Sequence, residues 1–252
     1  MSSGGYALMR RKRISILAVL LAAVMGAPAA AQSYDDCVAM IETDPVAAER
    51  QAHAWAQADG GAPAKHCQAL AMLAQGAEQR AAALMVEIAA GDRTLPDRVR
   101  ADLFVEAGEV FLDTGRLRLA EDAVQRAILL IGPDRAPLTL GARIKAERKN
   151  WRGAVGDLDQ ALAEGAPDAG LLVLRASAKR RLGELVEARS DLIWAEELAP
   201  ELPSLWLERG SLAERNKDRD AARAAWLKAI DLDRDGPVGK AAQLRLQRMD
   251  SQ

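Results

Sequence analysis

Few residues in this chain have versatile chemistry: it contains two cysteines, Cys37 and Cys67, and two histidines, His53 and His66. Two thiolates and two imidazoles are a common zinc ligand set, and two cysteines in an oxidising compartment form a disulfide. Side chains of adjacent helical residues point about 100° apart, so His66 and Cys67 could not easily share one ion. We therefore expect no metal site, and two unpaired thiols remain as the alternative to a disulfide.

No arrangement of side chains suggests catalysis. The sequence lacks G-x-S-x-G, H-E-x-x-H, a glycine-rich phosphate loop and C-x-x-C. Two histidines near the N-terminus leave little for acid–base work at neutral pH. Carboxylates such as Asp157 and Asp159, or Glu196 and Glu197, have the spacing of a solvated helix face. We predict that the protein is not an enzyme and uses no cofactor.

A period of 34 residues organises most of the chain. With Ala120 as position 20, the units are 101–134, 135–168, 169–202 and 203–236. Positions 8, 20 and 27 are glycine or alanine in every unit, and positions 4 and 24 are bulky and apolar. Small residues let two helices approach closely, and bulky residues fill the space beside the crossing. This period predicts a solenoid of helix pairs.

Turn residues occur where the helices of a unit must end. Position 15 is Gly115, Lys149, Gly183 and Lys217 in successive units. A glycine there ends a helix at little cost because it adopts a left-handed conformation. Pro203 and Pro237 both stand at position 1, where a proline loses no helical hydrogen bond.

The pattern resembles the tetratricopeptide repeat, which has small residues at positions 8, 20 and 27 and bulky ones at 4, 11 and 24. Phe111 matches position 11, whereas Lys145, Lys179 and Ala213 depart from it. The resemblance extends to a fifth unit at 62–95, separated from the others by about five extra residues. It implies an all-α, right-handed superhelical solenoid of antiparallel helix pairs.

Both ends of the array need caps that present a polar face to solvent. We expect residues 32–61 to form a truncated opening unit without a full helix pair, and residues 237–252 to form a closing helix. In the closing helix, Leu244 and Leu246 are expected to cover the last unit. Lys240, Arg245 and Arg248 are expected to face solvent.

Residues 1–31 read as a secretory signal peptide. A basic run at 10–13 precedes an apolar stretch at 14–25, and Ala29-x-Ala31 follows as a cleavage pattern. Cleavage after Ala31 would leave Gln32 as the first residue. An uncleaved membrane anchor is the alternative, but the apolar stretch is short for a span. We therefore expect the protein in the periplasm of a Gram-negative bacterium.

Removal of residues 1–31 leaves 30 basic and 36 acidic residues, a net charge of −6. An acidic chain without a basic stripe gives no support to nucleic-acid binding. No second apolar run is long enough to span a membrane.

The resemblance also places the two cysteines. With Ala48 at position 20 of the opening unit, Cys37 falls at position 9 and Cys67 at position 6 of the next unit. First helices of neighbouring units lie side by side in tetratricopeptide solenoids, and an exported chain meets an oxidising compartment. We expect a Cys37–Cys67 disulfide that joins the opening unit to the array and stabilises it by roughly 2–4 kcal/mol.

Tetratricopeptide proteins bind partners in a concave groove lined by positions 2, 5, 9, 12 and 13 of the first helices. Those positions here include Asp102 and Glu214 and are acidic toward the N-terminus and arginine-rich toward the C-terminus. Arginines could hold an acidic peptide through bidentate hydrogen bonds. The alternative is a solvated groove with internal pairs such as Arg143 with Glu147. The candidate binding residues are Glu109, Asp113, Arg143, Glu147, Arg180, Arg181 and Arg215.

These observations favour a scaffold that binds a protein or peptide partner during cell-envelope assembly or maintenance. The second hypothesis is a receptor for a small ligand or lipid in the groove, although charged groove positions count against it. Trp206 and Trp226 occupy core positions, whereas Trp194 at position 26 should face outward as another candidate contact.

Overall fold

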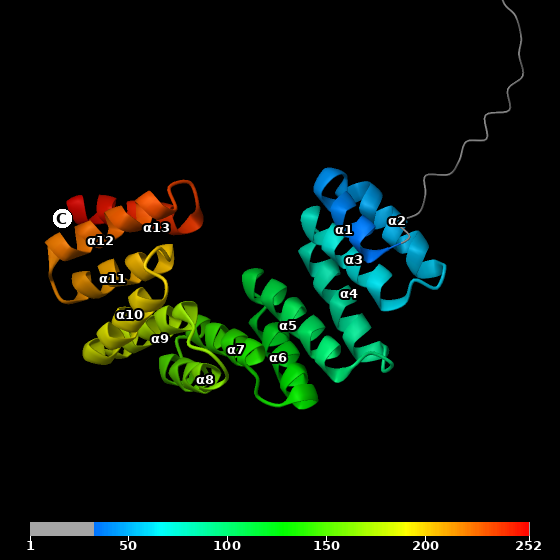
Figure 1. Cartoon of the computed structure of the whole chain (residues 1–252), viewed down its shortest axis with the longest axis horizontal. Helices are drawn as coiled ribbons and strands as arrows, with labels where there is room; N and C mark the ends of the chain where they lie inside the picture. The colour runs from blue at the N-terminus through cyan, green and yellow to red at the C-terminus, as the bar shows by residue number, and fades with distance from the viewer. Residues whose placement is uncertain (1–32, 252) are drawn as a thin grey trace, which may run out of the picture. The chain divides into compact units, whose positions relative to one another are not determined.

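The computed structural model describes residues 33–251, which form thirteen α-helices and no strands (Figure 1). The helices are α1 (Tyr34–Thr43), α2 (Pro45–Gln57), α3 (Gly61–Ala74), α4 (Glu78–Gly91), α5 (Asp97–Asp113), α6 (Leu117–Ile131), α7 (Arg135–Glu147), α8 (Trp151–Ala163), α9 (Ala169–Leu182), α10 (Leu185–Leu198), α11 (Pro203–Arg215), α12 (Arg219–Leu232) and α13 (Pro237–Asp250). The predicted signal peptide, with its predicted cleavage site between Ala31 and Gln32, lies outside the described residues. No helix within the described range is long and apolar enough to cross a membrane.

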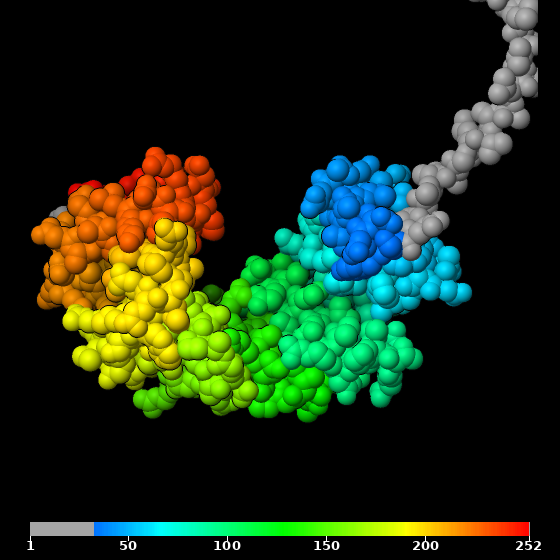
Figure 2. All heavy atoms as spheres, in the orientation of Figure 1, coloured from blue at the N-terminus to red at the C-terminus, as the bar shows by residue number. Residues whose placement is uncertain are grey.

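Each helix packs against the next one in the sequence, so the chain is an array of antiparallel helix pairs. Figure 1 shows these pairs following one another in chain order, and Figure 2 shows the same order among packed atoms. Substantial contacts between second neighbours join odd-numbered helices: α1 with α3, α5 with α7, α9 with α11, and α11 with α13. The surface formed by odd-numbered helices is called the inner face below, and that formed by even-numbered helices the outer face. This is the solenoid architecture that the 34-residue period predicts.

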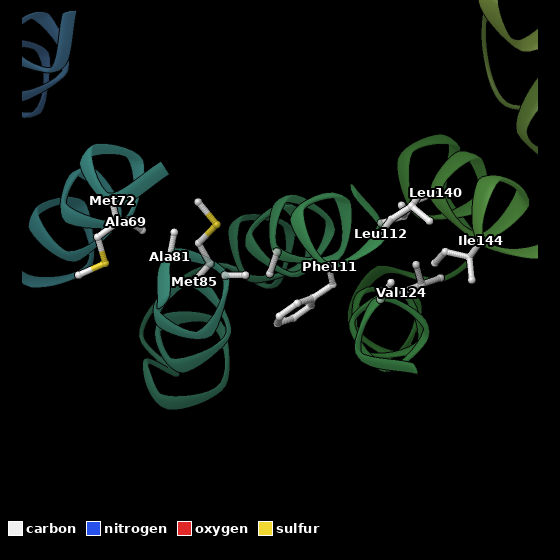
Figure 3. Close-up of a cluster of buried hydrophobic side chains, with 12 residues drawn as sticks. Ala69, Met72, Ala81, Met85, Phe111, Leu112, Val124, Leu140 and Ile144 are labelled. Carbon is white, nitrogen blue, oxygen red and sulfur yellow. The ribbon is translucent and has the colours of Figure 1, made fainter. Parts of the chain in front are cut away.

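The repeated small and bulky positions form the core. Position 20 is buried in every unit, as Ala120, Ala154, Ala188 and Ala222, and position 27 is buried throughout as alanine. Side chains from neighbouring units join in continuous apolar clusters. One cluster extends from α3 to α7 (Figure 3) and includes Ala69, Met72, Ala81, Met85, Phe111, Leu112, Val124, Leu140 and Ile144. The core therefore extends along the array and crosses the borders between units.

Glycine at position 8 occurs where a bulky neighbour takes the space of a side chain. A Cβ atom on Gly210 would overlap the indole of Trp226, which is completely buried. A Cβ atom on Gly108 would overlap Leu140 of the next unit. At these two positions the neighbouring side chain leaves little room for a larger residue, because interiors are close-packed.

Two kinds of turn alternate between the helices of a unit. Gly115 and Gly183 adopt left-handed conformations, with φ of 72° and 88°, and the residues after them give no side-chain cap. Lys149 and Lys217 adopt the same conformation, with φ of 60° and 64°. The residue after each lysine caps the next helix: Asn150 accepts from the Gly153 N–H and Asp218 from the Ala221 N–H. The cap offsets the strain of a left-handed lysine.

The two ends differ in part from expectation. The opening segment contains a complete helix pair, because Asp44 alone separates α1 from α2 and its side chain caps α2. Helix α5 begins at Asp97, before the boundary expected at residue 101. The predicted disulfide between Cys37 and Cys67 is present, with both residues buried between α1 and α3.

The closing helix α13 packs as expected at Leu246 but not at Leu244. Its buried side chains are Ala242 and Met249, with Leu246 partly buried beside them, all on one side of the helix. Leu244 is 60% exposed, so the prediction that it covers the last unit is wrong. Helical periodicity explains this, because residues 242 and 244 point in nearly opposite directions.

Candidate partner-binding surface

Charged side chains on the inner face pair between neighbouring odd-numbered helices. Arg143 on α7 bonds to Glu109 on α5, and its Nη2 lies 3.3 Å from Oδ1 of Asp113. The pair of Arg143 with Glu147 on the same helix, which the sequence offered as an alternative, is replaced by pairing that crosses from α7 to α5. Arg143 is therefore partly neutralised by two carboxylates.

Arg180 is not available to a partner. Its guanidinium bonds to both carboxylate oxygens of Glu208 on α11, and the two side chains are only 11% and 10% exposed. The prediction of an exposed Arg180 is wrong, because this side chain crosses to the neighbouring odd-numbered helix. The pair links α9 to α11, and removal of either partner would leave the other charge buried without compensation.

Three other arginines give the C-terminal part of the inner face its positive charge. Arg181 is exposed, with its guanidinium 5.4 Å from the ring centroid of Trp151, and Arg215 is exposed on α11. Among the described residues, neither forms an ion pair. Arg245 on α13 lies 3.6 Å from Glu214 and is 31% exposed, rather than fully facing solvent as expected. Burial, followed by the positive charge of Arg180 and to a smaller extent that of Arg181, lowers the pKa of Arg245.

The middle of the inner face contains a hollow of about 550 Å³ between α5, α7 and α9. Three predicted binding residues line it: Asp113, Arg143 and Glu147. Leu112 and Leu174 supply apolar surface, and Leu174 is exposed. The predicted residues therefore divide into an acidic central hollow and a basic C-terminal part, with Arg180 belonging to neither.

A hydrogen-bonded chain at the N-terminal end was not foreseen. The Tyr34 hydroxyl lies 2.8 Å from Nδ1 of His66, and Nε2 of His66 lies 2.7 Å from a carboxylate oxygen of Glu106. Burial, followed by the negative charges of Glu106 and Asp35, raises the pKa of Tyr34. These side chains border a hollow of about 340 Å³ that also includes Val99 and the predicted groove residue Asp102. His66 thus connects α3, on which it lies, with α1 and α5. Within the described range, no cluster of side chains could hold a metal ion.

The lysines that depart from the repeat pattern at position 11 have partners at position 23. Lys145 Nζ lies 2.7 Å from Oδ1 of Asp157, and Lys179 Nζ lies 2.9 Å from Oδ2 of Asp191. The other two units have an apolar residue at position 11 and alanine at position 23, namely Phe111 with Ala123 and Ala213 with Ala225. Comparing positions 11 and 23 in the sequence would have revealed this exchange. Asp157 is consequently not the solvated carboxylate that its spacing suggests, and Asp191 is also buried.

The tryptophans behave partly as expected. Trp226 is completely buried, and Trp194 is 41% exposed on the outer face. Trp206 is only partly buried, and it lines a hollow on the outer face.

Comparison with known proteins identifies the fold. No protein-family model and no curated protein sequence matches the chain. Among solved structures, the APC/C Cut9–Hcn1 complex matches with a TM-score of 0.64 at 13% identity, covering 84% of this chain and 42% of that chain. This chain therefore spans less than half of that protein. PilF of Pseudomonas aeruginosa matches with a TM-score of 0.62 at 15% identity, covering 84% of this chain and 97% of PilF.

A third solved structure is YrrB, described as a TPR protein with an unusual peptide-binding site. It matches with a TM-score of 0.52 at 18% identity, covering 76% of this chain and 96% of YrrB. At such identities, the similarity is evidence of fold alone. Together with the helix-pair array and its buried repeat positions, it establishes that the described chain is a tetratricopeptide-repeat solenoid.

Proposed function

We propose that this protein is a non-enzymatic scaffold of the periplasm that binds an acidic segment of a partner protein on its inner face. The solved structures of the same fold suggest protein–protein interaction as the general class. The acidic segment and the periplasmic location are our proposal. A role in cell-envelope assembly or maintenance accords with export.

The observation that carries the proposal is the arginine-rich surface formed by α9, α11 and α13. Arg181 and Arg215 are exposed and form no ion pair within the described residues, while Arg245 pairs with Glu214 at 3.6 Å. Guanidinium groups bind carboxylates through two parallel hydrogen bonds, so they favour acidic side chains or a C-terminal carboxylate. The Arg180–Glu208 pair supports this surface by fixing α9 beside α11.

The test of binding uses a charge reversal that spares the core. The R181E/R215E variant should lose at least nine-tenths of the partner captured by wild-type protein from detergent-solubilised envelopes, because two charge-assisted contacts are removed. The matched control is R152E, which makes the same change at an exposed arginine on the outer helix α8. Equal capture by R181E/R215E and wild type would place the binding surface elsewhere.

The test of location is separate. Residues 1–31 fused to alkaline phosphatase should give an active, exported enzyme, because that enzyme needs periplasmic disulfides. Cytoplasmic retention of the fusion would reject the periplasmic part of the proposal and leave the binding part standing.

A small-ligand receptor is the second candidate, and one observation favours it. The hollow beside Tyr34 and His66 has a mainly apolar lining that includes Leu95, Val99 and Leu103. Such a lining suits an apolar small molecule better than the charged central hollow does. Native mass spectrometry of protein purified from the periplasm of its native host distinguishes the two candidates. Only a receptor should retain a small molecule in a one-to-one ratio with the protein.

A further inference from the structure

The outer face contains a groove that recurs at the borders between units. Each groove lies between two even-numbered helices, and the odd-numbered helix between them forms its floor. Positions 21 and 25 of one unit and positions 7, 11, 23 and 26 of the next line it. Because the same positions recur, the grooves of this chain can be compared with one another directly.

Side chains of the protein occupy the groove between α8 and α10. Arg175, at position 7, lies 2.9 Å from Asp191 and 2.7 Å from Asp159. Lys179 bonds to the same Asp191, which is almost fully buried. Two cations and two carboxylates thus satisfy each other within this groove.

The groove between α10 and α12 lacks that filling. Ala213 and Ala225 stand at positions 11 and 23, where the preceding groove has Lys179 and Asp191. A hollow of about 650 Å³ results. The groove between α6 and α8, which keeps a lysine–aspartate pair at the same positions, encloses about 360 Å³. Loss of the pair is therefore accompanied by a larger hollow.

The open hollow has an excess of positive charge. Arg189, Arg209 and Lys228 line it, with Asp218 as its one lining carboxylate among the described residues. Arg209 bonds to Glu196, whereas Arg189 and Lys228 form no ion pair within the described chain.

Trp206 orders two of these cations. The Arg209 guanidinium lies 5.0 Å and the Lys228 ammonium 3.6 Å from the centre of the Trp206 ring. The Trp206 indole is itself fixed, because its N–H donates to the Pro200 carbonyl at 2.7 Å. Cations held over an aromatic ring lose less side-chain freedom when an anion binds.

Apolar surface adjoins this charge. Ile193, Ala221 and Ala224 are exposed residues that line the hollow beside the cations. We infer that the groove between α10 and α12 is a second binding site, which takes a peptide segment carrying a carboxylate next to an apolar side chain. The carboxylate would lie between Arg189 and Lys228, and the apolar side chain against Ile193 and the alanines. This inference goes beyond the proposed function, since the site is on the outer face and uses none of the inner-face arginines.

The experiment selects ligands from a random peptide library displayed on phage, with the purified protein as bait. Selected peptides are synthesised, and their affinities are measured by fluorescence anisotropy. The first variant, A213K/A225D, inserts the lysine–aspartate pair that the chain already contains at 145 and 157 and at 179 and 191. The second, R189E/K228E, reverses two exposed charges. The matched control, K145A/D157A, opens the groove between α6 and α8, where Glu121 and Gln160 replace the two cations.

We expect selected peptides to combine Asp or Glu with a neighbouring apolar residue. Both A213K/A225D and R189E/K228E should weaken their binding at least tenfold, whereas R181E/R215E and K145A/D157A should leave it unchanged. If circular dichroism shows that A213K/A225D does not fold, R189E/K228E decides. The inference is overturned if no acidic peptides are selected. It is also overturned if their affinity is unchanged in R189E/K228E or in a folded A213K/A225D. Loss of binding only in R181E/R215E would also overturn it while supporting the inner-face proposal.

Discussion

Arg180 of α9 and Glu208 of α11 form an ion pair in which both side chains are almost completely withdrawn from water. Removing one partner of such a pair leaves the other charge buried, which costs about 3–5 kcal/mol. Arg180 therefore has a structural role, although it occupies a position of the repeat that lines the groove in tetratricopeptide proteins.

We predict that R180E lowers the midpoint of urea unfolding strongly, because two carboxylates would then face each other in a buried place. R181E should leave the midpoint nearly unchanged, because Arg181 is exposed and has no carboxylate partner in the described chain. Equal midpoints for the two variants would mean that the Arg180–Glu208 pair contributes nothing to stability.

Substitution by alanine should change stability in opposite directions at Gly210 and Gly156. A methyl group on Gly210 would overlap the buried Trp226 indole, so G210A should destabilise by about 1–3 kcal/mol through overpacking. Gly156 lies in α8 with open space beside it, so G156A should stabilise by about 0.5–1 kcal/mol. Chemical denaturation of both variants checks this, and a stabilised G210A would contradict the packing described here.

Ala188 and Ala163 test the repeat register. Ala188 is completely buried where α9 and α10 meet, and Ala163 is exposed at the end of α8. A188L should therefore lower stability by about 1–3 kcal/mol, whereas A163L should have little effect. Thermal melts of the two variants are the measurement, and indistinguishable melting temperatures would show that the register is wrong.

Lys145 and Asp157 should couple in a double-mutant cycle. The Asp157 side chain is mostly buried, so K145A leaves it without its partner, while K145A/D157A recreates the alanine pair found at 213 and 225. We expect the double variant to lose less stability than the sum of the singles, with a coupling of roughly 0.5–3 kcal/mol. If the stability changes of the two single variants, measured by urea titration, add up to that of the double variant, the contact contributes nothing to stability.

The disulfide and the predicted signal peptide together give a definite expected mass. Protein recovered from the periplasm should begin at Gln32 and contain no free thiol, as intact-mass analysis before and after alkylation will show. C37S/C67S should lower stability by roughly 2–4 kcal/mol, because the bridge closes a loop of 30 residues. Alkylation of two thiols without prior reduction would reject the bridge.

Much of the fold could be predicted because one spacing recurs. Ala120 and its equivalents are buried at every repeat, and the glycines at position 15 are left-handed where a helix must end. The disulfide followed from the same register. These features depend on local periodicity and on residue size, both of which are visible in a single sequence.

The candidate site was harder to predict because it depends on contacts between distant side chains. Position 12 of the repeat gave Arg180 as an exposed groove residue, but only the structure shows Glu208 reaching it from α11. Tyr34, His66 and Glu106 come from three helices, so their hydrogen-bonded chain has no fixed spacing in the sequence. The sequence itself shows that two alanines replace a lysine–aspartate pair. That this replacement leaves a hollow becomes visible only when α10, α11 and α12 are packed together.

The alternating turns imply that this array holds unused stability. Turns with glycine have a relaxed backbone but no side-chain cap, whereas those with Lys149 or Lys217 have the cap but a strained residue. The backbone strain and the missing cap each cost about 1 kcal/mol. Neither kind combines both advantages, although a glycine followed by asparagine or aspartate would do so. Since repeat stabilities add approximately along a solenoid, selection has left a margin at every turn that protein engineers could recover one unit at a time.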